Sequence, residues 1–306
     1  MSNFSIIALR SVELGVPDLG RAEAFYTNVW GLRVCARIGE IVYLRATGND
    51  HHVLALHPRT SAEILSVSFR AQSEEALTEL ANAVTSAGGK VIALATPNPE
   101  PDGGVVMKVA TPEGFVLRFH YGDLVHNDGT KQMAFAYRMS HVNLNCSDIE
   151  ATSRFFQNVL GLALTDRSRA MAFFRCNADH HAVVLADSGV DGLNHVAFMM
   201  PEWESVMRGS GRLIQAGYPI GWGVGRHGPG NNVFAYFLDP FGFVIEYTAE
   251  VLEVDESYQP HGPDYWVWPA GRTDHWGIAP AKPESVKKAQ LAISFAAPDA
   301  QISTPK

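Results

Sequence analysis

The chain has 306 residues, of which 46% are hydrophobic and 18% charged, proportions typical of a globular protein with room for two domains. Its formal net charge of -8, without any Lys- or Arg-rich run, argues against a nucleic-acid partner or an anionic membrane surface. The sequence shows no recognisable secretory leader and no stretch long enough to span a membrane. Three scattered cysteines, Cys35, Cys146 and Cys176, exclude a disulfide framework, so we expect a cytoplasmic protein.

In chain order, residues 6–15 alternate like a half-buried strand, and a helical pattern follows from Pro17 to Gly31. Residues 138–147 and the segment after them repeat this arrangement. The hydrophobic periodicity predicts helices near 18–30, 73–88, 148–160 and 202–217, with short strands between them. Each half of the chain is therefore expected to follow the order strand, helix and then two or three strands, twice over.

Three matching motifs show that the second half repeats the first. Residues 28–32 (NVWGL) match 158–162 (NVLGL), and Asp-His-His occurs at both 50–52 and 179–181. Residues 111–119 (TPEGFVLRF) match 239–247 (DPFGFVIEY). The offset between the halves changes by only two residues over these motifs, which indicates a duplicated domain.

The repeat predicts an α+β fold with two tandem domains, each built from two βαβββ modules that together form a partly open barrel with helices outside. We place the N-terminal domain at 1–121, a polar linker at 122–137 and the C-terminal domain at 138–250. The remaining segment, 251–306, is rich in proline and aromatic residues. It can serve as a lid or cavity wall, or as a strap over hydrophobic surface or an oligomer contact.

Three residues of the second half are candidate metal ligands: His141, His195 and Glu246. Each lies within a predicted strand, where side-chain alternation lets it point into the barrel while its neighbours pack outward. Two histidines and one carboxylate form the facial triad that holds non-haem Fe(II) or Mn(II). Aligning the halves places Ser11, Ser66 and Arg118 at the equivalent positions, so we expect metal only in the second half.

The segment 225–247, GRHGPGNNVFAYFLDPFGFVIEY, adds His227 and Tyr236 to Glu246 within one loop and two strands. Its pattern of Gly225, His227, Tyr236, Asp239-Pro240, Gly242 and Glu246 resembles that of the type I extradiol ring-cleavage dioxygenases of the vicinal oxygen chelate superfamily. The resemblance covers about residues 6–250. Ala235 departs from it, because the family usually has a larger aliphatic residue before the tyrosine.

This resemblance implies that O2 cleaves a catechol-type aromatic diol beside its hydroxyl groups, giving a muconic semialdehyde-type product. It implies His141, His195 and Glu246 as ligands of Fe(II), with Mn(II) as the other option. It also implies His181 as catalytic acid/base, while His227 and Tyr236 bond the deprotonated substrate oxygen. A homo-oligomer is a further implication.

His180 competes with His181 for the acid/base role. Adjacent residues of a strand face opposite sides, so only one of the two can enter the cavity. The Ala-Val-Val-Leu that follows His181 is typical of the family's catalytic histidine, which favours His181. His52 of the first half aligns with His181 where no metal is expected, so the His-His pair also reflects ancestry.

Three further residues, Asn143, Phe173 and Trp222, are candidates for contacts to the substrate or support of the ligands. A strand-end hydrogen bond would equally explain Asn143, and plain core packing would explain the two aromatic residues. Arg226, beside His227, could bind a substrate carboxylate or simply be a solvated loop residue.

Two other functions are compatible with the fold. A glyoxalase- or epimerase-like isomerase also uses His and Glu ligands, although such sites usually draw them from both modules. A metal-free protein that binds small molecules would leave the triad and the spacing of His227 and Tyr236 unexplained. A serine hydrolase is excluded because no GxSxG motif precedes the histidines.

Overall fold

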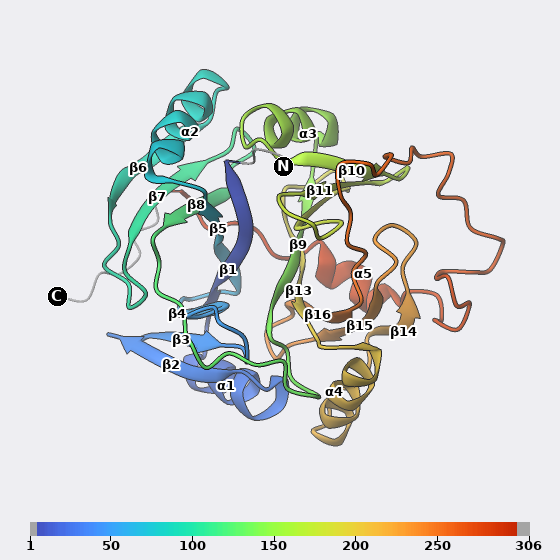
Figure 1. Ribbon diagram of the computed structural model, residues 1–306. Helices are drawn as coiled ribbons and strands as arrows, with labels where there is room; N and C mark the ends of the chain where they lie inside the picture. Colours follow the sequence, from blue (N-terminus) through green and yellow to red (C-terminus); the bar gives the residue numbers. More distant parts are fainter. Residues whose placement is uncertain (1–4, 299–306) are drawn as a thin grey trace.

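The structure, a computed structural model, describes residues 5–298 (Figure 1). Among these residues, the first half contains eight strands and three helical elements, two of which follow each other directly. Its first module comprises β1 (Ile6–Val16), α1 (Leu19–Ala24), the π-helical η1 (Phe25–Trp30), β2 (Arg33–Ile38), β3 (Ile41–Arg45) and β4 (Leu54–Pro58). Its second module comprises β5 (Glu63–Ala71), α2 (Glu74–Ser86), β6 (Lys90–Pro97), β7 (Val105–Ala110) and β8 (Val116–Tyr121).

The second half repeats this order. Its first module comprises β9 (Arg138–Cys146), α3 (Ile149–Asn158), β10 (Ala163–Arg167), β11 (Met171–Arg175) and β12 (Val183–Asp187). Its second module comprises β13 (Gly192–Met199), α4 (Trp203–Gln215), β14 (Trp222–Arg226), β15 (Val233–Leu238) and β16 (Val244–Ala249). One more helix, α5 (Glu284–Gln290), belongs to the tail.

Each half forms one eight-stranded sheet, and the two sheets have the same strand order. The orders are β2-β3-β4-β1-β5-β8-β7-β6 and β10-β11-β12-β9-β13-β16-β15-β14. In each sheet the two modules meet where their first strands pair antiparallel, and the outer strands do not pair with each other, so the barrel stays open. The predicted α+β fold with tandem partly open barrels is therefore confirmed.

The four predicted helices are present, and local capping explains where three of them begin. Asp18, Ser73 and Asp148 each accept a hydrogen bond from the backbone N–H three residues later, which satisfies a donor that the first helical turn leaves free. The tail helix α5 was not predicted, because its seven residues follow a proline-rich segment without a long periodic pattern.

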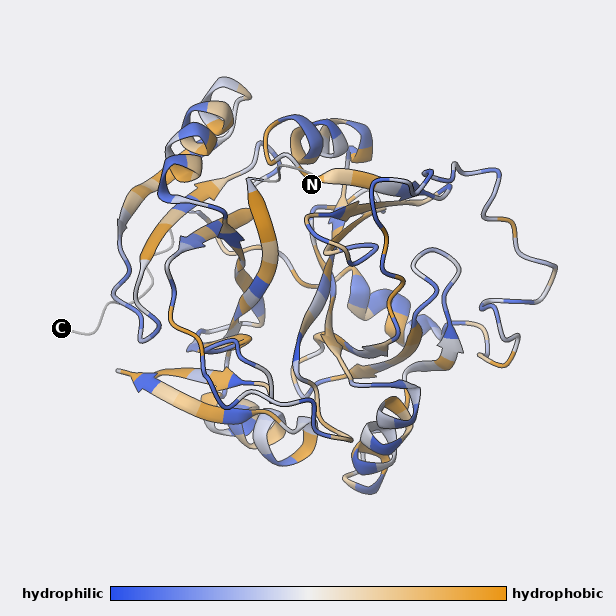
Figure 2. Ribbon diagram, viewed as in Figure 1, coloured by the Kyte–Doolittle hydropathy of each residue, from blue (hydrophilic) through white to orange (hydrophobic). Residues whose placement is uncertain are grey.

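Hydrophobic and hydrophilic residues both occur along the strands and along the helices (Figure 2). One buried contact between the halves is a stack of Trp30 on Tyr247, with ring centroids 3.7 Å apart. Tyr26 adds a hydrogen bond to Asp239 across the same junction. These contacts hold the two barrels together through their cores.

Two compositional expectations can be compared with the structure. Cys35, Cys146 and Cys176 form no disulfide. Within residues 5–298, none of the helices has the length and apolar character needed to cross a membrane.

Candidate metal centre and active site

A single row of residues crosses the second sheet and places most of the candidate site. His141 of β9 pairs with Ala197 of β13, and Ala197 pairs with Glu246 of β16. Glu246 pairs with Tyr236 of β15, and Tyr236 with Trp222 of β14. Directly paired residues share one face of a sheet, so this register brings the four functional side chains to the same face, with the small Ala197 leaving space between two of them.

His195 completes a group of three converging ligand atoms. It lies two residues before Ala197 on β13, and hence on the same face of the sheet, where it pairs with Asn143. The Nε2 atoms of His141 and His195 are 3.2 and 3.0 Å from Oε2 of Glu246 and 3.3 Å from each other. All three residues are buried.

The donor set fits a divalent cation. No described residue donates a well-directed hydrogen bond to either carboxylate oxygen of Glu246, although both oxygens are buried. Burial alone would raise the pKa of Glu246, but the neighbouring His141 and His195 hold it well below its usual value. Burial lowers the pKa of His195 to about 4. An ionised carboxylate beside a neutral imidazole is the protonation state that metal binding requires.

Hydrogen bonds behind the two histidines orient them. Nδ1 of His195 lies 2.8 Å from Oδ1 of Asn194, and because that oxygen can only accept, Nδ1 carries the proton. This tautomer leaves the Nε2 lone pair for a metal. Nδ1 of His141 lies 3.2 Å from the hydroxyl of Ser140. The sequence alone did not indicate either supporting residue.

A cavity of about 480 Å³ opens onto this centre, a size suited to a small ligand. Glu246 is fully buried and is not part of its lining. The other eight candidate residues border the cavity: His141, Asn143, Phe173, His181, His195, Trp222, His227 and Tyr236. The tail adds Trp266, Val267, Trp268, Thr273, Lys282 and Gln290, so it forms part of the wall.

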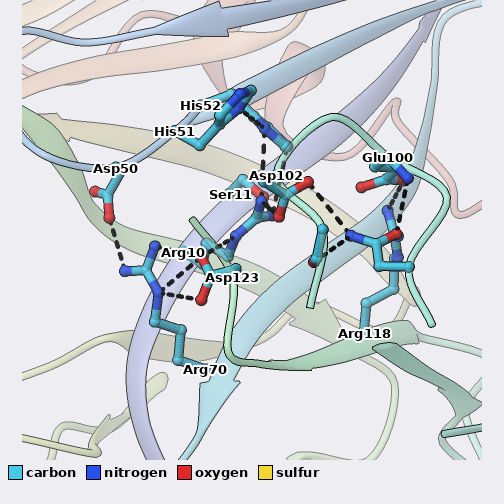
Figure 3. Close-up of polar contacts among 12 residues, drawn as sticks. Arg10, Ser11, Asp50, His51, His52, Arg70, Glu100, Asp102, Arg118 and Asp123 are labelled. Carbon is cyan, nitrogen blue, oxygen red and sulfur yellow. Dashed lines mark hydrogen bonds and ion pairs between the residues drawn. The ribbon is translucent and has the colours of Figure 1, made fainter. Parts of the chain in front are cut away.

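The equivalent place in the first half holds ion pairs (Figure 3). The register aligns Arg118 with Glu246, because β5 pairs Ser68 with Arg118 as β13 pairs Ala197 with Glu246. Arg118 forms ion pairs with Glu13 and, at 2.7 Å, with Glu100. These two carboxylates thus already share a fixed cation.

A second group of ligand-type residues, His52, Glu100 and Asp102, also lies in the first half. Arg10 pairs with Asp102, and its guanidinium lies 3.4 Å from the ring of His52 (Figure 3). Arg118 pairs with Glu100. Two buried guanidinium groups therefore repel a metal cation from this group, in contrast to the triad of the second half.

Comparisons with known proteins agree with this architecture. A sequence profile of the Glyoxalase/Bleomycin resistance protein/Dioxygenase superfamily matches residues 8–119 and 138–247. The chain belongs to this superfamily. The two matches correspond to the two sheets, so each half is one superfamily domain.

Several superfamily members are similar over different parts of the chain. Metapyrocatechase 2 from Cupriavidus necator is 36% identical over 143 residues, which cover 46% of this chain and 42% of that protein. A manganese-dependent 2,3-dihydroxybiphenyl 1,2-dioxygenase from Geobacillus genomosp. 3 is 23% identical over 275 residues, covering 81% and 87% of the two chains. The solved Mn(II)-bound glyoxalase from Novosphingobium aromaticivorans is 32% identical, with a TM-score of 0.85 and coverage of 92% and 94%.

In the present chain, His181 and His180 occupy different environments. His181 borders the cavity, with its ring centroid 4.5 Å from that of His141. Burial and the neighbouring His141 and His180 hold its pKa well below the usual value. His180 is fully buried and does not border the cavity; its Nε2 lies 2.8 Å from Oδ2 of Asp166 on β10.

A hydrogen-bonded chain continues from His181 toward the tail. The Nδ1 atoms of His181 and His180 are 3.0 Å apart, and His180 reaches Asp166 through Nε2. The hydroxyl of Tyr258 donates to Asp166 at 3.1 Å, and the backbone N–H of His261 donates to the other oxygen at 2.8 Å. Sequence analysis missed Asp166, because its partners come from distant parts of the chain.

Tyr236 and His227 form a pair on the opposite side of the centre. The tyrosine hydroxyl lies 3.1 Å from Nε2 of His227. Burial raises the pKa of Tyr236 well above its usual value and lowers that of His227 to about 3. Both groups are therefore neutral at physiological pH and available as hydrogen-bonding partners.

Arg226 does not border the cavity. It forms an ion pair with Glu250 and lies 4.9 Å from the ring centroid of Trp276. Of the two options that the sequence left open for Arg226, the structure favours a role in the loop over contact with a substrate.

Proposed function

We propose that this chain cleaves the ring of a catechol-type aromatic diol with O2 at a divalent iron or manganese ion held by His141, His195 and Glu246. The observation that carries the proposal is the triad itself: three converging, buried ligand atoms, supplied by one half only and opening onto a ring-sized cavity. Bound Fe(II) or Mn(II) would supply the electronic route between the diol and triplet oxygen. Relatives named as a metapyrocatechase and as a dihydroxybiphenyl dioxygenase support this choice.

In the net reaction, the aromatic C–C bond beside the two hydroxyl groups breaks and both atoms of O2 enter a muconic semialdehyde-type product. The protein groups position the diol. Trp222 and Phe173 border the cavity and offer flat apolar surfaces to the ring. The hydroxyl of Tyr236 and Nε2 of His227 bond the deprotonated diol oxygen.

His181 is the proposed acid/base. Asp166 can only accept, so Nε2 of His180 carries a proton and its Nδ1 accepts a hydrogen bond from Nδ1–H of His181. Nε2 of His181 is then left unprotonated. Burial keeps the imidazole pKa low, so the ring is neutral at the start of the reaction and a proton that it takes from the substrate is readily returned later.

The test begins with protein purified without oxygen. Metal content is measured first, followed by oxygen uptake and visible absorbance after addition of catechol, methylcatechols, dihydroxybenzoates and 2,3-dihydroxybiphenyl. We expect about one Fe or Mn per chain, oxygen consumption and a yellow ring-fission product. Folded protein without metal would overturn the proposal in favour of a binding protein.

A second candidate function is that of a metal-dependent isomerase, favoured by the similarity to a Mn(II)-bound glyoxalase. Against it, the first half supplies Ser11, Ser66 and Arg118 at the equivalent positions, and Arg118 is tied to Glu13. Metal-loaded protein that consumes no oxygen on any diol, but isomerises a thiol adduct of methylglyoxal, would establish this alternative.

Assembly into a homo-oligomer stays a prediction. Analytical ultracentrifugation of the metal-loaded protein would test it.

A further inference from the structure

The tail delivers one lysine, Lys282, into the wall of the cavity. Hydrogen bonds on both sides fix its position. The indole N–H of Trp222 donates to the carbonyl of Pro280 at 2.9 Å, and Asn145 donates to the carbonyl of Gln290 at 2.6 Å. Helix α5, which starts two residues after Lys282, lies against β13 and β16 (Figure 1).

Apolar packing also anchors this segment. Val286 of α5 is buried in a cluster with Trp222, Phe234 and Tyr236. Gln290 is buried and donates to Asn194, the residue that orients His195. Lys282 is thus held by the same framework that supports the candidate metal centre, unlike a solvated surface lysine.

The contacts of the Lys282 ammonium leave part of its hydrogen-bonding capacity open. Nζ donates to Oε1 of Gln290 at 3.1 Å and lies 4.4 and 5.7 Å from the ring centroids of Trp222 and Tyr236. Among residues 5–298, no carboxylate lies within ion-pair distance of it, and Glu246 attracts it from farther away. An ammonium has three donors, so two remain for a group inside the cavity.

With metal and diol bound, the cavity would lack one negative charge. A divalent ion, the carboxylate of Glu246 and a diol bound as a monoanion sum to zero. Lys282 then adds one positive charge to a space lined mainly by aromatic and neutral groups, with the exposed Arg169 as a further cation in the lining. A partly desolvated charge is costly unless it is paired, so a second negative charge on the ligand would stabilise the complex.

We propose that Lys282 binds an acidic substituent, such as a carboxylate, on the ring of the diol substrate. This inference rests on the proposed function and specifies its substrate class. Tyr236 and Trp222 follow Glu246 in the row of paired residues, and Nζ of Lys282 lies near the rings of both. The two rings therefore lie between the triad and Lys282. A ring that chelates the metal and packs on Trp222 therefore directs a substituent toward Nζ.

Two other roles for Lys282 would give different results. If Lys282 only tethered the tail through Gln290, its removal would weaken acidic and neutral diols alike. If it instead bonded a diol oxygen, every diol would lose by the same factor. The test must therefore compare ligands that differ in one substituent.

The experiment uses two matched pairs: 3,4-dihydroxybenzoate with 4-methylcatechol, and 2,3-dihydroxybenzoate with 3-methylcatechol. Wild type, Lys282→Met, Lys282→Arg and Lys287→Met are compared. Lys287 is the control, since it lies on the exposed side of α5 and pairs with Glu284. For each pair, kcat/KM is measured with oxygen, and dissociation constants are measured without oxygen by tryptophan fluorescence of the metal-loaded protein.

We expect wild type to prefer the acidic member of at least one pair. Lys282→Met should lower that preference about 10- to 100-fold, the range for a hydrogen bond to a charged partner. Lys282→Arg should restore much of it, and Lys287→Met should leave it unchanged. An unchanged preference in Lys282→Met, or an equal loss for both members, would overturn the proposal.

The binding measurement separates this proposal from the proposed function. If no diol is cleaved but the acidic ligands lose affinity selectively in Lys282→Met, the acidic subsite stands and ring cleavage does not. If diols are cleaved without any dependence on Lys282, ring cleavage stands and the acidic subsite does not.

Discussion

The two halves of this molecule have one fold and two different interiors. Strand order and register are the same, and the row that carries His141, Glu246 and Tyr236 in the second half carries Ser11, Arg118 and Lys108 in the first. One half presents ligands for a cation, whereas the other already contains its cations as arginines (Figure 3). The barrel itself therefore does not require the triad, which strengthens a chemical explanation for it.

The comparison also shows how each half deals with charge. In the first half, Arg10 and Arg118 are buried, and acidic partners surround them. In the second half, Glu246 is buried without any such fixed cation beside it. A metal ion bound to Glu246 would compensate its buried charge, as the guanidinium groups compensate buried carboxylates in the first half.

The largest effect is expected from Glu246→Ala. Removing the carboxylate deletes the negative charge and one of three ligands, so metal content should fall from about one ion per chain to near zero. Oxygen uptake on diols should disappear with it. Metal content is measured by elemental analysis, and Glu250→Ala at the exposed end of the same strand region is the control. Full metal occupancy in Glu246→Ala would remove this residue from the ligand set.

His181→Phe and His52→Phe compare the same position in both halves. Register places them together, because Val183 pairs with Val142 as Leu54 pairs with Val12. We expect His181→Phe to retain metal and diol binding but to lose turnover by about 10²- to 10⁴-fold, the usual contribution of a general acid or base. His52→Phe should not change turnover per folded molecule. Loss of metal from His181→Phe would show that ligand and acid/base roles had been assigned wrongly.

The fold could be predicted because the periodic patterns are local and because the two halves of the chain repeat them. Strand alternation placed His141, His195 and Glu246 on one face, and the structure gives that geometry. The pattern could not reveal Asp166 or Lys282, whose contacts depend on how the tail returns to the second barrel. The start of the tail matches the linker, since Glu253 bridges Asp179 as Val125 bridges Asp50, but the repeat offered no comparison for the later part that holds Tyr258 and Lys282.

The ion pairs of the first half were equally hidden. Arg118 was visible as a replacement for a ligand, but its partners Glu13 and Glu100 lie more than a dozen residues away in sequence and meet it only in the folded barrel. Long-range pairing of this kind leaves no periodic trace.

Arg118→Met should chiefly affect stability. The change leaves the buried Glu13 without its partner, and breaking a buried ion pair from one side costs about 3–5 kcal/mol of the free energy of unfolding. Urea denaturation measures this loss. The double variant Glu13→Leu with Arg118→Leu should recover part of it, and adding Glu100→Gln should recover more, because Glu100 also loses its cation when Arg118 is removed. Metal content should remain that of wild type, and a loss of metal would show that the halves are coupled.

The smallest effect is expected from Asp166→Asn, which tests the difference between the two His-His pairs. His51 and His52 in the first half are also hydrogen-bonded, at 3.1 Å, yet Ala36 lies where the second half has Asp166. The carboxylate is therefore not needed to hold such a pair. Its distinct contribution is to fix which nitrogen of His180 carries the proton.

The amide of Asp166→Asn can be oriented in only one favourable way. Oδ1 of Asp166 accepts the backbone N–H of His261, so the amide oxygen must stay there and the NH2 group must face His180. The proton of His180 then moves to Nδ1, and His181 is left with its proton on Nε2. That is the reverse of the tautomer that can accept a substrate proton. We expect kcat to fall about tenfold, with unchanged metal content and little change in KM.

Tyr258→Phe is the matched control for this variant. It removes a donor to Asp166 but keeps the carboxylate and hence the tautomer of His180. Its kcat should therefore stay closer to wild type than that of Asp166→Asn, and the pH profile of kcat should shift only in Asp166→Asn. Equal rates in the two variants would mean that Asp166 merely ties the tail to β10, leaving the His181 tautomer to be set by the cavity alone.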